Sequence, residues 1–257
     1  MKKLILFGMC ISMLFSCQQK ENITLSGLQR EHFQTNIDGN KTDLYVLTNH
    51  NGMEVCITNF GGRVVSIVVP DKASNMQDVV LGFDSIQDYM TIPTDFGASI
   101  GRYANRISQG KLVMNEDTIQ FPRNNFGHCL HGGPNGWQYK VYDGLQIDAQ
   151  TLELTLNSPD DDENFPGNVL AKVKYKLTDD NSLQISYEAT TDKKTVINMT
   201  NHSYFNLSGN PSNPITDHIL YLNAGAFTPV DSTFMTTGEI RPVKGTPMDF
   251  TAPSIIG

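Results

Sequence analysis

The sequence predicts an all-β fold, either a sandwich or a barrel, in one domain. Apolar and polar residues alternate along most of the 257-residue chain, and alternation with period two is typical of a half-buried strand. Turns rich in Asp, Asn, Gly and Pro separate short apolar runs, without the alternation of strands and helices that indicates a parallel sheet. No segment repeats with a period of about 20–50 residues, so a propeller or solenoid is not expected.

The first expected strands form a hairpin. Residues 44–48 and 53–58 are strand-forming runs on either side of residues 49–52, which supply Asn and Gly to the turn. Residues 64–69 are a β-branched run that ends at a Pro-Asp pair, and residues 79–83 are the next expected strand. The sequence therefore predicts four strands here, the first two of them paired.

The second half of the chain continues the strand pattern. Further strands are expected at residues 152–156, 170–177, 183–189 and 195–199, with turns such as the Asp-Asp-Asn at 179–181 between them. The only helix candidate of any length lies at residues 85–90 and spans one or two turns.

Residues 1–17 have the pattern of a secretory signal peptide, with a basic start, an apolar stretch and a small residue near the end. The apolar stretch is shorter than the roughly 20 residues of a membrane span. Residues 14–17 also resemble the lipobox of bacterial lipoproteins, in which Cys17 would be lipidated. A plain secretory signal and an unprocessed apolar N-terminus are the alternatives. We expect an exported, periplasmic or cell-surface lipoprotein, attached to the membrane only through its lipid, with a tether at 18–29 and a domain at 30–257.

Composition and charge argue against two classes of protein, nucleic-acid binders and disulfide scaffolds. The formal net charge of −8 and the pI of about 5.1 argue against nucleic-acid binding, which needs clustered Lys and Arg. Four cysteines are too few for a disulfide scaffold in a chain of this length. Cys56 and Cys129 lie in the expected domain, where they could form a disulfide or be two separate buried thiols.

Two segments break the strand pattern with dense polar groups. Residues 101–107 carry Arg102, Asn105 and Arg106, whose side chains can form an array of donors for hydroxyl oxygens. Arginines on an edge strand are, however, often only solvated. Residues 198–207 place Asn, His, Ser and Tyr at the end of an expected strand, where such groups must bond to one another or to a ligand.

Histidines are the candidate proton-transfer groups. His128 and His131 lie in a third polar segment, residues 125–133, and two glycines follow His131, so a ligand can approach the backbone closely. A metal pair is poorly supported because no further ligand is obvious. Proton transfer by one of them is the better functional interpretation, and a structural loop histidine is the alternative. With His202, which can also act as an acid or base, and Asp249, which could equally cap a turn, these groups suit a site that binds a polyol and moves protons.

Three blocks in these segments resemble the signature sequences of the aldose 1-epimerase (galactose mutarotase) family. They are Gly-Arg-Tyr-Ala-Asn-Arg-Ile at 101–107, Leu-His-Gly-Gly-Pro-Asn-Gly at 130–136 and Thr-Asn-His-Ser-Tyr-Phe-Asn-Leu at 200–207. The resemblance runs from about residue 30 to the end. It implies a large antiparallel β-sandwich of the galactose-mutarotase type. It also implies interconversion of the α and β anomers of a free aldose, such as galactose or glucose, by acid/base ring opening and closure without cofactor or metal.

The resemblance also implies roles for single residues. His202 would be the general acid at the ring oxygen, and His131 would hold or help protonate the same region. Asn105 and Arg106 would bind sugar hydroxyls, and Tyr204 would line the pocket. Because Arg supplies several fixed donors, these side chains suit recognition of one face of a polyol.

Asp249 would, by the same resemblance, accept hydrogen bonds from ring hydroxyls. The family's catalytic base is a glutamate in its C-terminal portion, beyond the block around Asp249, and no residue of this chain matches it by motif. Glu188 and Glu239 lie on the wrong side of the blocks. We therefore expect a C-terminally truncated sandwich that is inactive or much slowed as an enzyme. A non-catalytic carbohydrate-binding protein of the same fold is the alternative.

Overall fold

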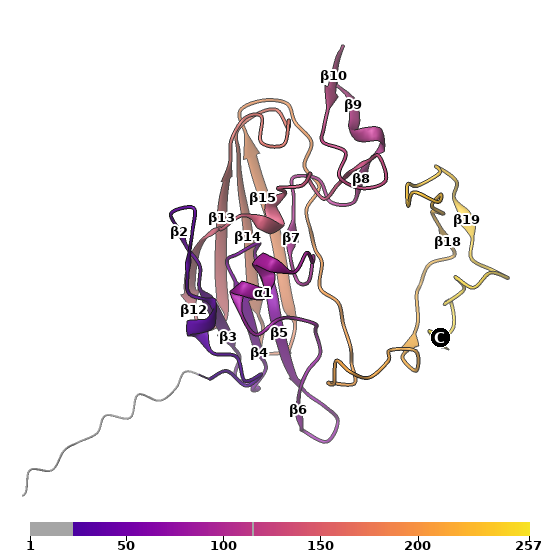
Figure 1. Cartoon of the computed structure of the whole chain (residues 1–257). Helices are drawn as coiled ribbons and strands as arrows, with labels where there is room; N and C mark the ends of the chain where they lie inside the picture. The colour runs from indigo at the N-terminus through magenta and orange to yellow at the C-terminus, as the bar shows by residue number, and fades with distance from the viewer. Residues whose placement is uncertain (1–22, 115) are drawn as a thin grey trace, which may run out of the picture.

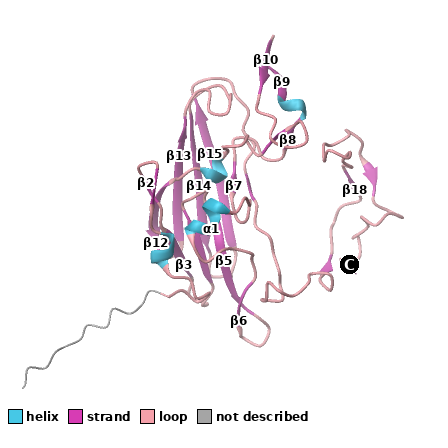
Figure 2. Cartoon of the chain, in the orientation of Figure 1, coloured by secondary structure: helices cyan, strands magenta, loops and turns pink. Residues whose placement is uncertain are grey.

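The computed structural model describes residues 23–114 and 116–257, which form mostly antiparallel β-structure (Figures 1 and 2). One four-stranded sheet has the order β3 (Leu44–Thr48), β4 (Glu54–Thr58), β5 (Arg63–Pro70) and β6 (Met76–Asp78). The other has the order β12 (Asp143–Asp148), β13 (Thr151–Ser158), β14 (Val169–Leu177) and β15 (Leu183–Thr191). Every strand in both sheets is antiparallel to its neighbours.

The two sheets share one hydrophobic core, which makes them a sandwich. Side chains from β4 and β5, such as Val55 and Val64, pack in the same cluster as Leu154, Val173 and Tyr175 from β13 and β14. Alternate residues of β14 are buried while those between them are more exposed, as expected for a strand covered on one face.

Strand β4 is buried on both faces because a second core covers its other side. Cys56 on that side packs with Leu28, Phe33 and Tyr89. Tyr89 comes from α1 (Ile86–Thr91), which begins after Ser85, whose hydroxyl accepts a hydrogen bond from the Asp88 N–H. This cap is the local reason for a helix at the predicted place.

Short elements connect and extend the sandwich. Three 3₁₀ turns are η1 (Arg30–Phe33), η2 (Ser108–Gly110) and η3 (Trp137–Tyr139). The remaining strands form two-stranded pairs: β1 (Asn36–Ile37) with β2 (Asn40–Lys41), β7 (Ser99–Ile100) with β16 (Thr200–Asn201), β8 (Arg106–Ile107) with β11 (Cys129–Leu130), β9 (Lys111–Met114) with β10 (Asp117–Gln120), β17 (Ile219–Leu220) with β20 (Ser254–Ile255), and β18 (Ala226–Phe227) with β19 (Arg241–Pro242).

The structure confirms most of the expected strands, namely the hairpin at 44–58 and the strands at 64–69, 152–156, 170–177 and 183–189. The strand expected at 79–83 is wrong: β6 ends at Asp78, whose carboxylate accepts the Ile67 and Val80 N–H groups, and within 79–83 only Val80 forms a bridge, with Phe205.

The strand expected at 195–199 is also wrong. Only Asn198 forms a bridge, with Tyr103, and its N–H donates to the Arg102 carbonyl. Its side-chain amide donates to the Ala104 carbonyl as well. The segment therefore pairs with an irregular loop instead of a strand.

The two cysteines of the described chain are separate buried thiols, so the second alternative is confirmed. Burial raises the pKa of Cys56 to about 12 and that of Cys129 to about 11, which keeps both protonated and unreactive.

The expected signal peptide, its lipobox and Cys17 lie outside the described residues and stay predictions. The last part of the expected tether packs on the body, since Leu28 is buried and the Leu25 N–H donates to the Glu54 carboxylate. Packed residues of the domain therefore begin before residue 30. Within residues 23–114 and 116–257, no helix is long and apolar enough to cross a membrane.

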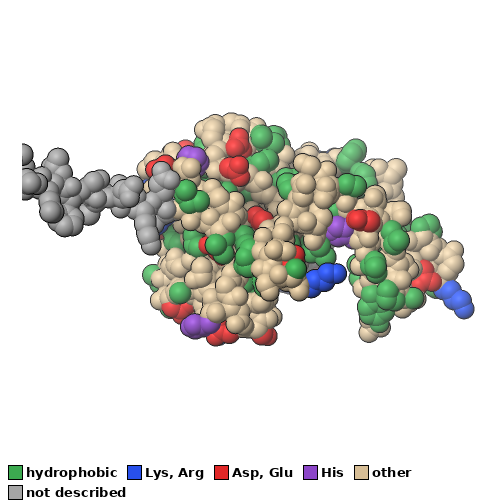
Figure 3. All heavy atoms as spheres, turned by 90° about the horizontal axis from the view of Figure 1, so that it is seen from below, with side chains coloured by type: hydrophobic (Ala, Val, Ile, Leu, Met, Phe, Trp, Pro, Cys, Tyr) green, Lys and Arg blue, Asp and Glu red, His purple; other side chains and the backbone are tan. Residues whose placement is uncertain are grey.

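The C-terminal segment that carries β18 and β19 stands beside the sandwich in Figure 1. The space-filling view shows hydrophobic side chains on its surface (Figure 3), and Ile219, Tyr221 and Ile240 are among the exposed ones. Phe234 in this segment reaches the main body, where its ring lies 5.4 Å from the Arg106 guanidinium carbon.

Arg102 is a structural residue, which corrects the expected donor array of residues 101–107. The residue is 1% exposed, and its guanidinium donates to the Ser158 hydroxyl and to four backbone carbonyls, those of Ser158, Pro159, Phe165 and Pro166. It therefore ties the loop before β8 to the loop between β13 and β14, and has no donor left for a ligand.

We expect Arg102→Lys to lower the free energy of unfolding by about 3 kcal/mol or more, because an ammonium cannot reach all five acceptors and each buried unpaired group costs about 1–3 kcal/mol. Urea unfolding followed by circular dichroism measures this. Arg106→Lys, whose partners are amide side chains at a partly exposed position, is the control and should cost less. Equal losses for the two variants would contradict the structural role of Arg102.

Candidate active site

Two short strand pairs bring distant polar segments together. In the first, Thr200 and Asn201 of β16 pair with Ile100 and Ser99 of β7. His202 follows β16 directly, and its backbone N–H donates to the Ala98 carbonyl at 2.8 Å. The pairing therefore places the His202 ring beside the loop that precedes β7.

The second pair places His131. Leu130 and Cys129 of β11 pair with Arg106 and Ile107 of β8. His131 follows β11, and its N–H donates to the carbonyl of Asn105, the residue before β8. Both His131 and Asn105 have positive φ, of 52° and 62°, so the backbone turns sharply at both residues where the strands separate.

Close backbone packing holds the His131 loop in place. A Cβ at Gly132 would lie 2.2 Å from the Gly101 carbonyl oxygen, and one at Gly101 would lie 2.0 Å from the Trp137 ring. Only glycine fits at either position. Gly132 thus serves close contact between the His131 loop and the loop that carries Gly101.

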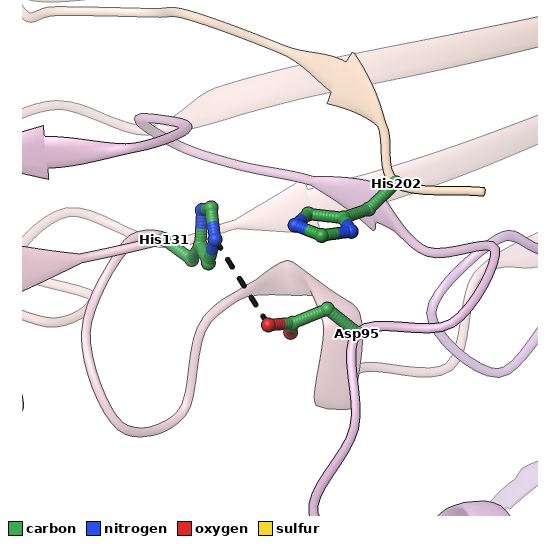
Figure 4. Close-up of side chains that lie close together, drawn as sticks. All are labelled: Asp95, His131 and His202. Carbon is green, nitrogen blue, oxygen red and sulfur yellow. Dashed lines mark ion pairs between the residues drawn. The ribbon is translucent and has the colours of Figure 1, made fainter. Parts of the chain in front are cut away.

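Asp95, His131 and His202 converge at one place (Figure 4). The two imidazole rings are perpendicular, with centroids 5.2 Å apart. The Asp95 Oδ2 lies 3.9 Å from the His131 Nε2, and one polar atom from each of the three side chains lies within 4.8 Å of the others. The side chains of His131 and Asp95 are 13% and 26% exposed, so the cluster is largely shielded but open to solvent on one side.

A backbone amide fixes the proton on His131. The Asn105 N–H donates to the His131 Nδ1 at 3.0 Å, so Nδ1 must carry a lone pair, and the neutral ring carries its proton on Nε2. A second proton on Nδ1 would face the Asn105 N–H. Burial, the neighbouring His202 and Arg106 lower the pKa of His131, while Asp95 opposes them. His131 is therefore a neutral donor whose Nε2–H points toward Asp95.

The same hydrogen bond bears on metal binding. Asp95, His131 and His202 are close enough to hold an ion, but the His131 Nε2 carries the ring's proton and its Nδ1 is already an acceptor. Metal ligands normally present a free nitrogen and donate through the other one. This arrangement favours hydrogen bonding to a ligand over coordination of a metal.

His128 is a structural loop histidine, as in the alternative considered above. Its Nδ1 accepts from the Gln109 N–H at 2.9 Å, and its Nε2 lies 2.8 Å from the Thr233 hydroxyl. Both ring nitrogens are engaged away from His131, so the two histidines do not form a metal pair.

Some of the other predicted site residues also lie near the two imidazoles. Arg106 lies next to Asn105, to whose side-chain oxygen it donates, and it also donates to Asn125. The exposed ring of Tyr204 lies 5.1 Å from that of His202 and 5.2 Å from that of Phe96. Three of the predicted residues, Asn105, Arg106 and Tyr204, thus lie around the two imidazoles.

Asp249 stands apart from this group. Its carboxylate accepts the Thr251 N–H and hydroxyl hydrogen bonds, which lower its pKa. In the described part of the chain, no hydrogen bond or ion pair links it to His131, His202 or Arg106. Its contacts are those of a turn cap, and its role toward a sugar stays a prediction.

Asp95 was missed at the sequence level. It lies in a Pro-Thr-Asp-Phe-Gly stretch before β7, where an Asp is most often a turn residue. The available signal was its position six residues before the polar block at 101–107, but only the β7–β16 pairing brings it to His202.

We expect the free energy of unfolding to fall as the pH drops below about 6.5, the ordinary pKa of histidine, through the contribution of His131. Because its pKa in the folded protein is lowered, the unfolded chain binds the proton first, and the loss continues until the pH reaches the folded pKa. In His131→Asn, which keeps an acceptor for the Asn105 N–H, this contribution disappears. Urea titrations from pH 7.5 to pH 5 test this, with the exposed His32→Asn as control, and an unchanged slope in His131→Asn would refute it.

Comparison with known proteins places this geometry in a family. The family model described as aldose 1-epimerase matches residues 43–257. Aldose 1-epimerase of Escherichia coli is 36% identical over 219 residues, which are 85% of this chain and 63% of the relative. Galactose mutarotase of Sus scrofa is 38% identical over 205 residues, 80% of this chain and 59% of the relative. The chain thus spans less than two thirds of the length of these relatives.

Solved structures agree with the sequence comparison. An aldose epimerase homologue from C. elegans superposes with a TM-score of 0.80 at 32% identity, over 84% of this chain and 66% of that one. Galactose 1-epimerase from Lactobacillus acidophilus superposes with a TM-score of 0.79 at 29% identity, over 87% of this chain and 65% of that one. The antiparallel sandwich expected from the sequence is confirmed, and the chain belongs to the aldose 1-epimerase family.

Proposed function

We propose that this protein interconverts the α and β anomers of a free aldose, such as galactose or glucose, by opening and reclosing the hemiacetal ring. The observation that carries the proposal is the pair of adjacent imidazoles, of which His131 is held in one tautomer by a backbone N–H while the His202 ring receives no hydrogen bond from the described residues. Relatives named aldose 1-epimerase and galactose mutarotase support the choice of substrate.

His202 is the general acid in this proposal. Among the described residues, no hydrogen bond reaches its ring, so either nitrogen is free to give and take a proton. In the forward step His202 gives its proton to the ring oxygen, a base removes the proton of the C1 hydroxyl, and the bond between C1 and the ring oxygen breaks to leave an aldehyde. Rotation about C1–C2 and reversal of these steps give the other anomer.

His131 holds the substrate without changing its own charge. Its Nε2–H can donate to a sugar oxygen, whereas uptake of a second proton would cost the hydrogen bond from Asn105. Arg106 and Asn105 would donate to hydroxyls at the same edge, and Tyr204 would contact the sugar beside His202. The resemblance assigns the base to a C-terminal glutamate with no counterpart by motif here, so we propose that residues 1–257 alone turn over slowly.

We expect freshly dissolved α-D-glucose and α-D-galactose to reach anomeric equilibrium faster with the purified protein, and His202→Ala to lose this acceleration. General acid catalysis contributes about 10²–10⁴-fold, so any acceleration by the wild type should fall to the spontaneous rate in the variant. Polarimetry measures the rates.

His50→Ala is the matched control, because His50 is an exposed histidine in the turn between β3 and β4, where it pairs with Asp179. Acceleration that survives in His202→Ala would refute the assignment of the acid. Sugar binding by the wild type with no acceleration at all would favour the alternative function, a carbohydrate-binding protein of the same fold.

A further inference from the structure

We propose that Asp95 is a further substrate-contacting residue, whose carboxylate accepts a hydrogen bond from the same sugar hydroxyl to which the His131 Nε2–H donates. This inference rests on the proposed function, because it requires a sugar between the two imidazoles. It adds a negatively charged acceptor beside the two imidazoles, where the predicted residues that assemble are His131, His202, Asn105, Arg106 and Tyr204.

The spacing of the cluster suits one hydroxyl oxygen. The Asp95 Oδ2 and the His131 Nε2 are 3.9 Å apart, which is longer than the roughly 3.2 Å limit of an N–H···O hydrogen bond. A hydroxyl that forms two hydrogen bonds of about 2.8 Å at a tetrahedral angle bridges about 4.6 Å. The polar atoms of Asp95, His131 and His202 lie within 4.8 Å of one another, so small adjustments admit such an oxygen.

The Asp95 carboxylate is uncommitted although its backbone is fixed. Buried Arg63 donates to the Thr94 carbonyl at 3.2 Å and to the Phe96 carbonyl at 2.9 Å, on either side of Asp95. The Asp95 carbonyl accepts from the Ala98 N–H. Across the described chain no hydrogen bond reaches the carboxylate itself. Hydrogen bonds to its backbone carbonyls thus hold the loop in place, and both carboxylate oxygens remain for a ligand. A rigid backbone with a free side-chain acceptor is a preorganised contact.

Gly97 adds to this rigidity. Its φ is +66°, and a Cβ there would lie 1.9 Å from the Val64 carbonyl oxygen, so the loop after Asp95 lies directly against β5. The Asn201 side chain donates to the Gly97 carbonyl at 2.9 Å. Asp95 and His202 are therefore held to each other through two adjacent loops.

The chemistry of the two partners is complementary. A carboxylate only accepts, so a hydroxyl must donate to Asp95, and the lone pair of that hydroxyl then faces the His131 Nε2–H. An ion pair between Asp95 and His131 is a weaker interpretation, because the Asn105 N–H keeps His131 neutral. A hydroxyl that satisfies both groups would be discriminated strongly from a hydrogen atom at the same carbon.

The test is a binding cycle with deoxy sugars. Binding of glucose and of its 2-, 3-, 4- and 6-deoxy derivatives to the full protein is measured by saturation-transfer NMR for the wild type, Asp95→Ala and Asp95→Asn. We expect the wild type to bind one deoxy sugar about tenfold or more weakly than glucose. Asp95→Ala should discriminate these two sugars least, because only the His131 Nε2–H then still contacts that hydroxyl. Asp95→Asn, which keeps an acceptor without charge, should show reduced discrimination.

Asp84→Ala is the control, since Asp84 is an exposed aspartate outside the cluster. Asp95→Ala affinities that fall equally for all sugars, or do not fall at all, would overturn the inference. Discrimination that depends on Asp95 without any mutarotation would refute the proposed function and leave Asp95 as a sugar contact. Mutarotation without any Asp95-dependent discrimination would overturn the sugar contact of Asp95 and leave the proposed function standing. A wild type that binds none of these sugars would overturn both the sugar contact and the proposed function.

Discussion

The guanidinium of Arg63 is the interaction on which the arrangement of the site depends. It is fully buried on β5 and donates to the carbonyls of Thr94, Phe96 and Gln138. The first two flank Asp95, and the third lies in η3, just beyond the His131 loop. Its charge faces carbonyl dipoles and the Tyr89 ring, 5.1 Å away, and burial lowers its pKa. One cation therefore fastens both sides of the site to the sandwich.

Two histidines of similar surroundings acquire different chemistry through a single backbone amide. The Asn105 N–H occupies one nitrogen of His131, and nothing comparable is seen at His202 in the described residues. The first ring is confined to one tautomer, while the second can exchange protons at either nitrogen. In a reaction that needs a mobile proton at one oxygen and a fixed donor at another, this asymmetry divides the two tasks without any further group.

The sequence predicted what depends on local pattern. The Asn-Gly turn gave the first hairpin, Ser85 the helix start, and the alternation in β14 a one-sided strand. It failed at residues 79–83 and 195–199, because each segment forms only one isolated bridge, with Phe205 in the first case and Tyr103 in the second, and these partners lie in loops. The resemblance to the family predicted the site residues that lie in its signature blocks. Asp95 did not, because its place depends on a pairing between segments about a hundred residues apart.

The site also explains why so many polar groups gather where strands end. Buried polar atoms normally find partners within the protein, and the backbone groups around the cluster do so. The Asp95 carboxylate and the His202 ring, however, receive no hydrogen bond from the described residues, although the loops that carry them are held by Arg63 and Asn201. Rigid placement of unpartnered donors and acceptors has an electrostatic cost in the free protein. Under the proposed function, the hydroxyls of the sugar would supply the missing partners and offset that cost.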